Sequence, residues 1–449
     1  MTGRSEVSDQ PMTADRVTAA ILADLLAARH PGVVVDSPPG AGKSTLVVRA
    51  AAEIAATGER VMIVAQTNEQ VDDLVVRLSA RLGAQRPDAV VGRLSRAGFG
   101  APQRIEGLPN VAVSSDAGEL AHATVTIATA AKWAHVRDRH WRWAIVDEAY
   151  QMRSDSLLGL ASRFDRALFV GDPGQLDPFS TVDSDRWRGL AWDPMQSAVA
   201  VLLRNNPDLP VHRLPVSWRL PASAEGVVSR AFYPFTGFRS GAAAHERELR
   251  FTGPSRSGPV DATLDEAARS GWALLELPAR HTIRTDAEAV AAVATLTRRL
   301  VERGAIARSG AGERADARPV TPDRIAVGAA HRDQVAALRG ALGDVPVDID
   351  TANRLQGREY DVTVFLHPLS GRRDATAFHL EAGRLCVLAS RHRQACVVVA
   401  RAGIRDLLDE HPGSVPVHLN EPVRFPDGWA AHQTMLAHLE EHRVSSSGP

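Results

Sequence analysis

The sequence predicts an α/β protein with two tandem domains, each built on a parallel sheet flanked by helices. Short apolar runs alternate with helical stretches, and strands that are apolar throughout are typical of a parallel sheet covered on both faces. The alternation stops at a proline-rich stretch, 205–215, and then resumes. A length of 449 residues is enough for two or three domains with their own cores.

The first domain is expected to begin with a helix, because apolar residues recur with helical spacing over 14–29. Its strands are expected in five apolar runs: VVVD at 33, VMIVA at 61, TVTIA at 124, WAIVDE at 143 and ALFVGD at 167. The stretch NNPDLPVHRLP at 205–215 is expected to be a linker to the second domain.

The second domain is expected to place strands at RIAVGAA (324), PVDID (346), DVTVFLH (361) and ACVVVA (395). Segments 236–262 and 303–323 are rich in Gly, Ser, Ala, Pro and Arg, which predicts loops or insertions whose arginines form either a solvated surface or a nucleic-acid contact. The tail VSSSGP is expected to be disordered. The predicted domains are 1–212 and 213–419, followed by a partly disordered C-terminal extension at 420–449.

The composition predicts a soluble, cytoplasmic and monomeric protein. Fifty-two basic residues balance 53 acidic ones, so any contact with a polyanion must come from a local patch. The polar N-terminus carries no signal-peptide core, and no apolar run reaches the roughly 18 residues of a membrane span. Two cysteines are too few for a disulfide framework or a zinc site. Abundant alanine and the preference for arginine over lysine indicate a GC-rich bacterial genome.

The stretch VVVDSPPGAGKST, at 33–45, predicts a loop that binds the phosphates of a nucleotide. Backbone N–H groups of a Gly-rich turn and the start of a helix would face the phosphates, with Lys43 on the β- and γ-phosphates and Ser44 on Mg²⁺. Ser37 stands where this motif usually has its first glycine. The alternative is a Gly/Pro turn without a ligand. The residues expected to hold the nucleotide here are Gly40, Gly42, Lys43, Ser44 and Thr45.

Two later strands are expected to end in residues that complete an ATP hydrolysis site. Asp147 would hold Mg²⁺ through water, and Glu148 would orient and deprotonate the attacking water; the alternative is a solvated acid pair. Gln175 follows the next strand and could sense the γ-phosphate. Arg219 and Arg391 could reach across a domain cleft to that phosphate, although a single arginine in an Arg-rich chain is more often a surface residue.

The order of short motifs resembles that of a superfamily 1 helicase, in the branch of the nonsense-mediated-decay RNA helicase and its DNA-processing relatives. The resemblance covers roughly 12–402. The matching motifs are SPPGAGKS, AQTNEQVDDLVVRL (65–78), TIATAAKW (126–133), DEAYQ, GDPGQLDP, VSWRLP, VGAAHRDQVAALR, TANRLQGREYDVTVF (351–365) and GRLCVLASRHR (383–393).

This resemblance implies two RecA-like P-loop domains with an ATP cleft between them, and it implies roles for further residues. Trp218 would stack on the base, and Arg219 and Arg391 would contact the γ-phosphate. Gln356 and Glu359 would join the nucleotide to the nucleic-acid strand. The small polar groups that would hold backbone phosphates, without reading base sequence, are Thr67, Asn68, Thr129 and Thr351.

The sequence also departs from the family pattern. Arg16 stands where relatives have a glutamine that reads adenine, and Asn353, Leu355 and Cys386 replace an Asp, a Phe and an Asn. Only about forty-five residues, 79–123, separate the second and third motifs, and few follow Gln175. The small barrel and helical arm that larger relatives insert at these two points are therefore expected to be absent or vestigial.

Three other signals are given structural interpretations. HLEEH at 438–442 fits an H-x-x-E-H zinc motif, but a solvated terminal helix is the preferred interpretation because little chain remains for another ligand. Cys386 and Cys396 are expected to pack in the core. Trp133 is expected to be a core residue, with base stacking as the alternative.

The sequence therefore predicts an ATP hydrolase that uses ATP and Mg²⁺ to move along single-stranded DNA or RNA, 5′ to 3′ by family resemblance. The rival prediction is a nucleotide-dependent switch that recruits partners without unwinding a duplex. A P-loop kinase of small substrates is a third alternative, which leaves the second α/β domain and its arginines unexplained.

Overall fold

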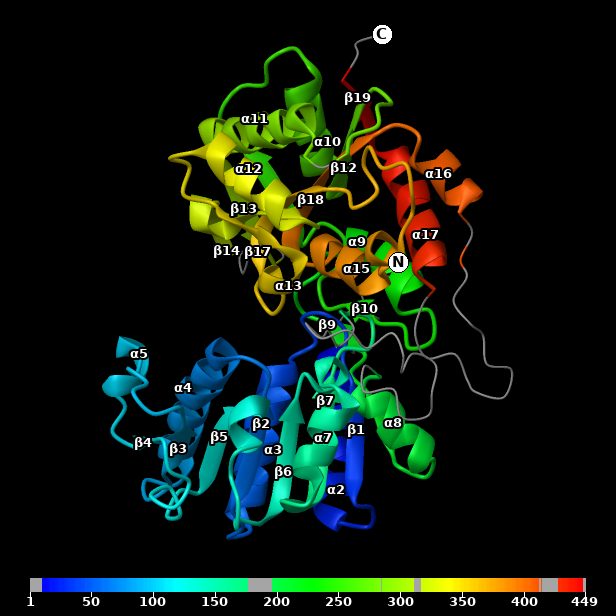
Figure 1. Cartoon of the computed structure of the whole chain (residues 1–449). Coiled ribbons are helices and arrows are strands. Elements are labelled where there is room, and N and C mark those ends of the chain that lie inside the picture. The colour runs from blue at the N-terminus through cyan, green and yellow to red at the C-terminus, as the bar shows by residue number, and fades with distance from the viewer. Residues whose placement is uncertain are drawn as a thin grey trace.

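The computed structural model describes residues 10–176, 196–283, 285–310, 316–411, 413 and 427–446. Figure 1 shows two lobes, each with a central parallel sheet and covering helices. We call the lobe with the eight-stranded sheet the first lobe and the lobe with the six-stranded sheet the second lobe. The predicted fold class, two tandem α/β units with parallel sheets, is confirmed.

The first lobe contains eight parallel strands in the order β4-β3-β5-β2-β6-β7-β1-β8. The strands are β1 (Gly32–Asp36), β2 (Val61–Ala65), β3 (Val91–Leu94), β4 (Val111–Ser114), β5 (Val125–Thr129), β6 (Trp141–Asp147), β7 (Phe164–Gly171) and β8 (Val211–Arg213). The helices are α2 (Gln10–Ala27), α3 (Lys43–Ala56), α4 (Asn68–Gln85), α5 (Gln103–Glu106), α6 (Ala130–Trp133), the 3₁₀ turn η1 (Ala149–Gln151), α7 (Ser154–Ala161) and α8 (Ala198–Asn205).

Alternate residues of each central strand of the first lobe enter two separate cores. Val33 and Val35 of β1 pack with α2, α3 and α4, whereas Val34 packs on the other face with residues of α6, α7 and α8. Because both faces are covered, these strands are apolar throughout, which is the pattern from which the sequence predicted them.

The second lobe contains six parallel strands in the order β16-β15-β17-β18-β12-β19. The strands are β12 (Trp272–Leu277), β15 (Ile325–Ala329), β16 (Asp348–Thr351), β17 (Tyr360–Leu366), β18 (His392–Arg401) and β19 (Arg443–Ser445). The helices are α9 (Ala222–Phe232), α10 (Pro259–Ser270), α11 (Ala287–Arg303), η4 (Pro322–Arg324), α12 (Arg332–Leu342), α13 (Ala352–Leu355), α14 (Ala377–Leu380), α15 (Ala382–Ala389), α16 (Ile404–Glu410) and α17 (Gly428–Glu441).

The second sheet is also covered on both faces. Leu275 and Val397 pack with α10, α11 and α12, whereas Leu274 and Val398 pack with α9, α15 and α17. Cys386 and Cys396 are both fully buried in the second of these cores, as expected for small core residues. Trp133 lies in the core of the first lobe, with no exposed surface and its Nε1 donating to the carbonyl of Ile63.

Three segments predicted to lack regular structure contain strands. The proposed linker 205–215 includes β8, which pairs with β1 at the edge of the first sheet. Segments 236–262 and 303–323 contribute β11 (Arg247–Phe251), β13 (Ala305–Ser309) and β14 (Asp316–Pro319) to a small antiparallel sheet, and β10 (Arg239–Ser240), which pairs with β9 (Val216–Ser217). These strands were not predicted from the sequence because they are short. They are stabilised by pairing with distant strands and not by a local sequence preference.

The C-terminal segment also corrects two expectations. Val444 and Ser445 belong to β19, which pairs with β12, so this part of the expected disordered tail is ordered. The helix before it, α17, is not a solvated terminal helix: Met435 and Leu439 have no exposed surface and lie in the core of the second lobe. Among the described residues, no helix is long and apolar enough to span a membrane.

Candidate active site

Three loops of the first lobe meet because their strands are neighbours in the sheet. The order β6-β7-β1 places the carboxyl ends of these strands side by side, with Asp36 opposite Gly171 and Asp147 opposite Val170. In a parallel sheet, polar groups that follow the strand ends gather at one edge. The phosphate loop after β1, the acid pair at the end of β6 and the turn after β7 therefore face a common space.

The phosphate loop has the backbone that a phosphate-binding turn requires. Gly40 and Gly42 have φ of 72° and 92°, in the left-handed region that favours glycine, and Gly42 caps α3, which begins at Lys43. Ser37, at the position of the usual first glycine, is fully buried and donates its backbone N–H to the carbonyl of Gly171. The turn therefore accommodates this departure.

The phosphate loop also packs directly against the segment that leads into the second lobe. A Cβ atom on Gly40 would lie 2.3 Å from the Cβ of Arg219, so only glycine fits there. The backbone N–H of Trp218 donates to the carbonyl of Gly40 at 2.9 Å, and the Ser217 hydroxyl donates to the carbonyl of Pro39 at 2.6 Å. These contacts place Arg219 beside the loop.

A cavity of about 380 Å³ opens at this junction and is lined by both lobes. Its volume is in the range of small-molecule sites. The first lobe contributes Pro39, Gly40, Ala41, Gly42, Lys43, Ser44, Thr45, Arg77, Glu148 and Gln175, and the other side contributes Arg219, Gly357, Glu359 and Arg391. Arg77 and Gly357 were not among the residues predicted for this site.

Lys43 lies between two carboxylates of the first lobe. Its Nζ is 3.5 Å from Oε1 of Glu148 and 3.7 Å from Oδ2 of Asp172. Glu148 has a φ of 51°, a left-handed conformation that is uncommon for a residue with a side chain. Such strained residues are concentrated at functional sites.

The two aspartates in this region are buried among too few positive charges. Burial, followed by the nearby charge of Glu148, raises the pKa of Asp147 to about 7. Burial also raises the pKa of Asp172, even though Lys43 opposes the shift. A buried carboxyl with a raised pKa is stabilised when a cation binds beside it. Ser44 lines the cavity, whereas Asp147 is not among its lining residues; both side chains carry oxygen donors of the kind that Mg²⁺ prefers.

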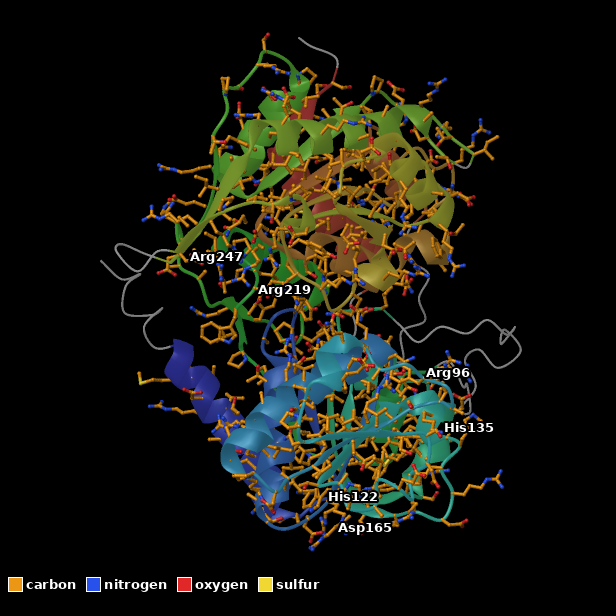
Figure 2. All side chains as sticks on the ribbon, turned by 90° about the vertical axis from the view of Figure 1, so that its left-hand side faces the viewer. Arg96, His122, His135, Asp165, Arg219 and Arg247 are labelled. Atoms are coloured by element: carbon orange, nitrogen blue, oxygen red, sulfur yellow. The ribbon has the colours of Figure 1, made fainter. Side chains whose placement is uncertain are left out.

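The two predicted arginines lie on the opposite side of the cavity, and Figure 2 shows Arg219 at the junction between the lobes. Arg219 is buried and donates from Nε to Oε2 of Glu359 at 3.3 Å; burial and the nearby charge of Arg391 lower its pKa to about 10. Arg391 donates to the carbonyl of Val387 and the hydroxyl of Ser390. Helix α15 ends at Ala389, so Arg391 lies in the turn before β18.

A hydrogen-bond network joins the phosphate loop to the second lobe through Asp172. Gln175 donates its side-chain amide to Asp172, and its Oε1 accepts from Nε2 of Gln356 at 2.6 Å. The hydroxyl of Tyr233, from the end of α9, donates to Oδ1 of Asp172 at 2.7 Å. Asp172 therefore contacts Lys43 and Tyr233 at once. Local sequence gave no signal for Tyr233, because its partner Asp172 lies 61 residues away.

Trp218 borders a second cavity, of about 230 Å³, next to the phosphate loop. Ala41, Gly42 and Thr45 line both cavities, so the two are adjacent. Trp218 is 40% exposed, and its ring lies against Gly241. Arg16 does not line this cavity; the polar side chains that helix α2 contributes to it are Asp15 and Thr18.

The residues predicted to contact nucleic acid lie at the starts of helices in both lobes. Thr67 caps α4 and Thr129 caps α6, and each hydroxyl accepts a backbone N–H of its helix at 3.2 Å. Asn68 accepts a hydrogen bond from Arg93, and Thr351 is the N-cap residue of α13 in the second lobe. The structure therefore gives Thr67 and Thr129 a capping role and does not gather all four side chains in one cavity.

An ion pair across the lobes connects the start of α4, where Thr67 and Asn68 lie, with the segment of the second lobe that holds Thr351. Arg358, between α13 and β17, donates to Oε2 of Glu69, the residue after Asn68, at 3.3 Å. Arg358 also pairs with Asp348 of β16 at 2.7 Å. The segment that holds Thr351 is thus tied to the start of α4 by exposed charges.

Comparison with known proteins places the chain in a family. Two AAA-domain family profiles match in succession, over residues 17–187 and 197–403. Similar solved structures include the PRRSV helicase, which is 14% identical over 96% of this chain and 66% of that one with a TM-score of 0.41. Another is arterivirus nonstructural protein 10, a helicase in complex with DNA, which is 14% identical over 86% of this chain and 62% of that one with a TM-score of 0.42.

This chain therefore spans only about two thirds of the length of those helicases. No curated protein matched the sequence. The AAA-domain matches are consecutive, cover most of the chain and coincide with the motif series. The chain therefore belongs to the AAA-domain proteins, and its motif series resembles that of the superfamily 1 helicases in the branch of the nonsense-mediated-decay RNA helicase and its DNA-processing relatives.

Proposed function

We propose that the protein is an ATP-dependent motor that moves along single-stranded DNA or RNA. The observation that carries this proposal is the cavity at the lobe junction, where the phosphate loop of one lobe faces Arg219, Glu359 and Arg391 across the site. A nucleotide bound there would contact both lobes, so its hydrolysis would weaken their association.

Residues of the first lobe would bind the nucleotide and prepare the water. Lys43 and the backbone of Gly40 and Gly42 would hold the phosphates, and Ser44 and Asp147 would hold Mg²⁺, which supplies charge neutralisation at the phosphates. Glu148 would accept a proton from the attacking water, whose position its carboxylate fixes. Trp218 would stack on the base in the adjacent cavity.

Residues of the second lobe would stabilise the transition state and would transmit the structural change at the γ-phosphate to the nucleic-acid contacts. Arg219 and Arg391 would donate to the γ-phosphate, because both are charged and line the cavity opposite Lys43. Gln175 and Gln356 hydrogen-bond across the junction, so a shift at the γ-phosphate would be transmitted to the segment that begins at Thr351.

The nucleic-acid strand would pass over the N-termini of the helices at which four small polar residues lie: Thr67, Asn68, Thr129 and Thr351. Short hydroxyl and amide groups and the N–H groups of helix N-termini bind backbone phosphates without selecting bases, as a motor requires. Alternating grip by the two lobes, opened and closed by ATP, would move the strand 5′ to 3′, the direction of this family branch.

An ATPase assay with and without single-stranded DNA and RNA tests this proposal. We expect at least one of the two polymers to stimulate turnover, and we expect Thr351→Ala to lose stimulation while it keeps basal hydrolysis. If neither polymer stimulates turnover, the motor is excluded. A tailed-duplex assay on the same preparation, with 5′ and 3′ tails compared, would then measure unwinding and direction.

A second candidate is a nucleotide-dependent switch that recruits partners without unwinding a duplex. Residues 79–123, where larger relatives insert a barrel, instead complete α4 and form β3, α5 and β4 at the edge of the main sheet. The second insertion point, after Gln175, lies mainly outside the described residues. Stimulated ATP hydrolysis without unwinding of either tailed duplex would favour a translocase or this switch over a helicase.

A further inference from the structure

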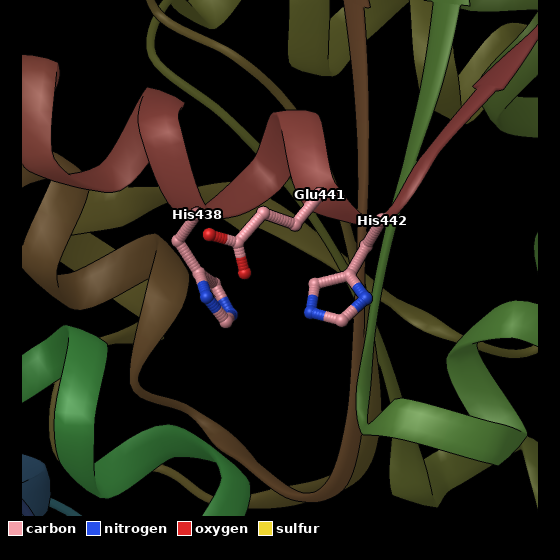
Figure 3. Close-up of side chains that lie close together, drawn as sticks. All are labelled: His438, Glu441 and His442. Carbon is pink, nitrogen blue, oxygen red and sulfur yellow. The ribbon is translucent and has the colours of Figure 1, made fainter.

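Three potential metal ligands lie together at the end of α17, away from the nucleotide cavity. His438, Glu441 and His442 are spaced by three and four residues, which places them on one face of the helix. One ligand atom from each lies within 4.8 Å of the other two. Figure 3 shows the two imidazole rings and the carboxylate directed to the same side of the helix end.

His442 is held in the orientation that a metal ligand requires. Its Nδ1 lies 2.7 Å from Oε1 of Glu266, on α10. Glu266 is itself fixed by Arg269, which donates to both of its carboxylate oxygens at 2.6 and 2.8 Å. A carboxylate on Nδ1 sets the tautomer of the ring and leaves Nε2 free to bind a metal, as in carboxylate–histidine–zinc arrangements.

A second, independent observation that points to a bound ion is the unpartnered ring nitrogen of His438. Its Nε2 is buried and has no hydrogen-bond partner among the described residues, and its ring packs edge-on against Trp272 at 5.3 Å. A buried polar atom without a partner requires an explanation, and a bound ion is one.

We propose that His438, Glu441 and His442 bind Zn²⁺, with Glu266 as the outer partner of His442. Two imidazoles and a carboxylate form a known zinc ligand set, and a water would complete a tetrahedral site. The charges around the site permit a bound cation. Arg230 places one positive charge near His438, whereas the charge of Arg269 is paired with Glu266. Glu441 itself supplies a negative charge. The rings are 4.9 Å apart, so modest side-chain rotation brings the ligand atoms to the roughly 3.3 Å separation of ligands around zinc.

The position of the site indicates a structural role. β19 begins immediately after His442, and the carbonyl of His442 accepts the backbone N–H of Leu274 at 2.9 Å. A zinc ion at the end of α17 would thus fasten the last helix and strand of the described chain to the core of the second lobe. None of its ligands lines the nucleotide cavity, so this proposal does not depend on the proposed function.

Metal content and thermal stability test the proposal on the full chain, after removal of any histidine tag. Chelator-treated protein is dialysed against Zn²⁺, and bound zinc is measured by mass spectrometry. We expect about one zinc per chain, a raised melting temperature and, with Co²⁺, the visible absorption of a tetrahedral site. Glu441 is exposed, so Glu441→Gln removes a ligand without disturbing the core and should weaken binding at least about tenfold.

The paired variants His438→Gln and His442→Gln should each lose the zinc-dependent rise in melting temperature. The matched control is His379→Gln, which breaks another close histidine pair: Nε2 of His379 and Nε2 of His331 are 3.0 Å apart. This variant should bind zinc like the parent chain. Less than about a tenth of a zinc per chain in the parent, or equal binding by the parent and Glu441→Gln, would overturn the proposal.

Discussion

Glu148 combines a strained backbone with a carboxylate 3.5 Å from Lys43, which is the geometry of a group held for one chemical task. Glu148→Gln preserves its shape but removes its basicity. We expect turnover to fall by about 10²–10⁴, the contribution of a general base, while ATP binding persists. Single-turnover hydrolysis and binding of a fluorescent nucleotide separate the two quantities. Near-normal turnover would exclude Glu148 as the base.

Among the described residues of the second lobe, no carboxylate pairs with Arg391, which lines the cavity opposite Lys43. Arg391→Ala should lower turnover by about 10³ or more if the guanidinium contacts the γ-phosphate. Because Arg391 is buried, the matched control is Arg384→Ala, another buried arginine of the same segment that does not line the cavity. The control should lose stability but keep turnover within a few-fold. Equal losses of turnover in both variants would contradict the assignment.

The raised pKa of Asp147 predicts how Mg²⁺ dependence changes with pH. With a pKa of about 7, the carboxyl is mostly protonated at pH 6 and mostly ionised at pH 8. Only the ionised form binds the metal, so the Mg²⁺ concentration for half-maximal turnover should be about tenfold higher at pH 6 than at pH 8. Asp147→Asn should remove this dependence. An unchanged Mg²⁺ requirement between the two pH values would contradict it.

The same group affects stability with the opposite sign from a salt-bridged aspartate. The pKa of Asp147 rises from 3.8 to about 7 on folding, so between these values the folded chain binds more protons than the unfolded chain. The free energy of unfolding should therefore fall as pH rises from about 4 to 7 and then level off. Asp147→Asn should flatten this part of the stability profile, as measured by denaturant unfolding without Mg²⁺.

A hydrogen bond from the hydroxyl of Tyr233 to Asp172 connects the end of α9 to the turn after β7. Tyr233→Phe would leave a buried carboxylate oxygen with fewer donors, which costs about 1–3 kcal/mol. Since Asp172 also contacts Lys43, we expect nucleic-acid stimulation of turnover to fall several-fold more than basal turnover.

The control for this variant is Tyr360→Phe, which removes a tyrosine–aspartate hydrogen bond, to Asp348, that lies within the second lobe. Both variants should lower the melting temperature, but only Tyr233→Phe should change the ratio of stimulated to basal turnover. Equal effects on that ratio would show that the Tyr233 bond contributes stability alone.

The two lobes are joined by direct contacts, including Gln175 to Gln356 and Glu69 to Arg358, and we call this arrangement closed. A nucleotide-driven motor must also populate an open one. Fluorophores on Leu158→Cys and Ile283→Cys can follow the change, because these positions are 63% and 92% exposed whereas Cys386 and Cys396 are fully buried. ATP added to the Glu148→Gln chain should raise energy transfer. Transfer that is independent of nucleotide would contradict ATP-driven closure.

Local sequence was sufficient for most of the central strands, for the phosphate loop and for many of the residues that line the cavity, because each of these features is encoded in a short stretch; β12 was not predicted. Apolar runs such as VMIVA at 61 fix a buried parallel strand, and the glycines of the loop fix its turn, whatever the rest of the chain does. The predicted lining residues Lys43, Glu148 and Arg391 accordingly lie around one cavity.

Tertiary structure alone decided the features that depend on distant partners. The edge strands β8 and β19 exist because β1 and β12 offer them hydrogen bonds, and their own three-residue sequences carry no strand signal. The Tyr233–Asp172 bond and the orientation of His442 by Glu266 likewise join residues 61 and 176 positions apart. Periodicity reports which face of an element is buried, whereas these contacts arise only when whole elements pack.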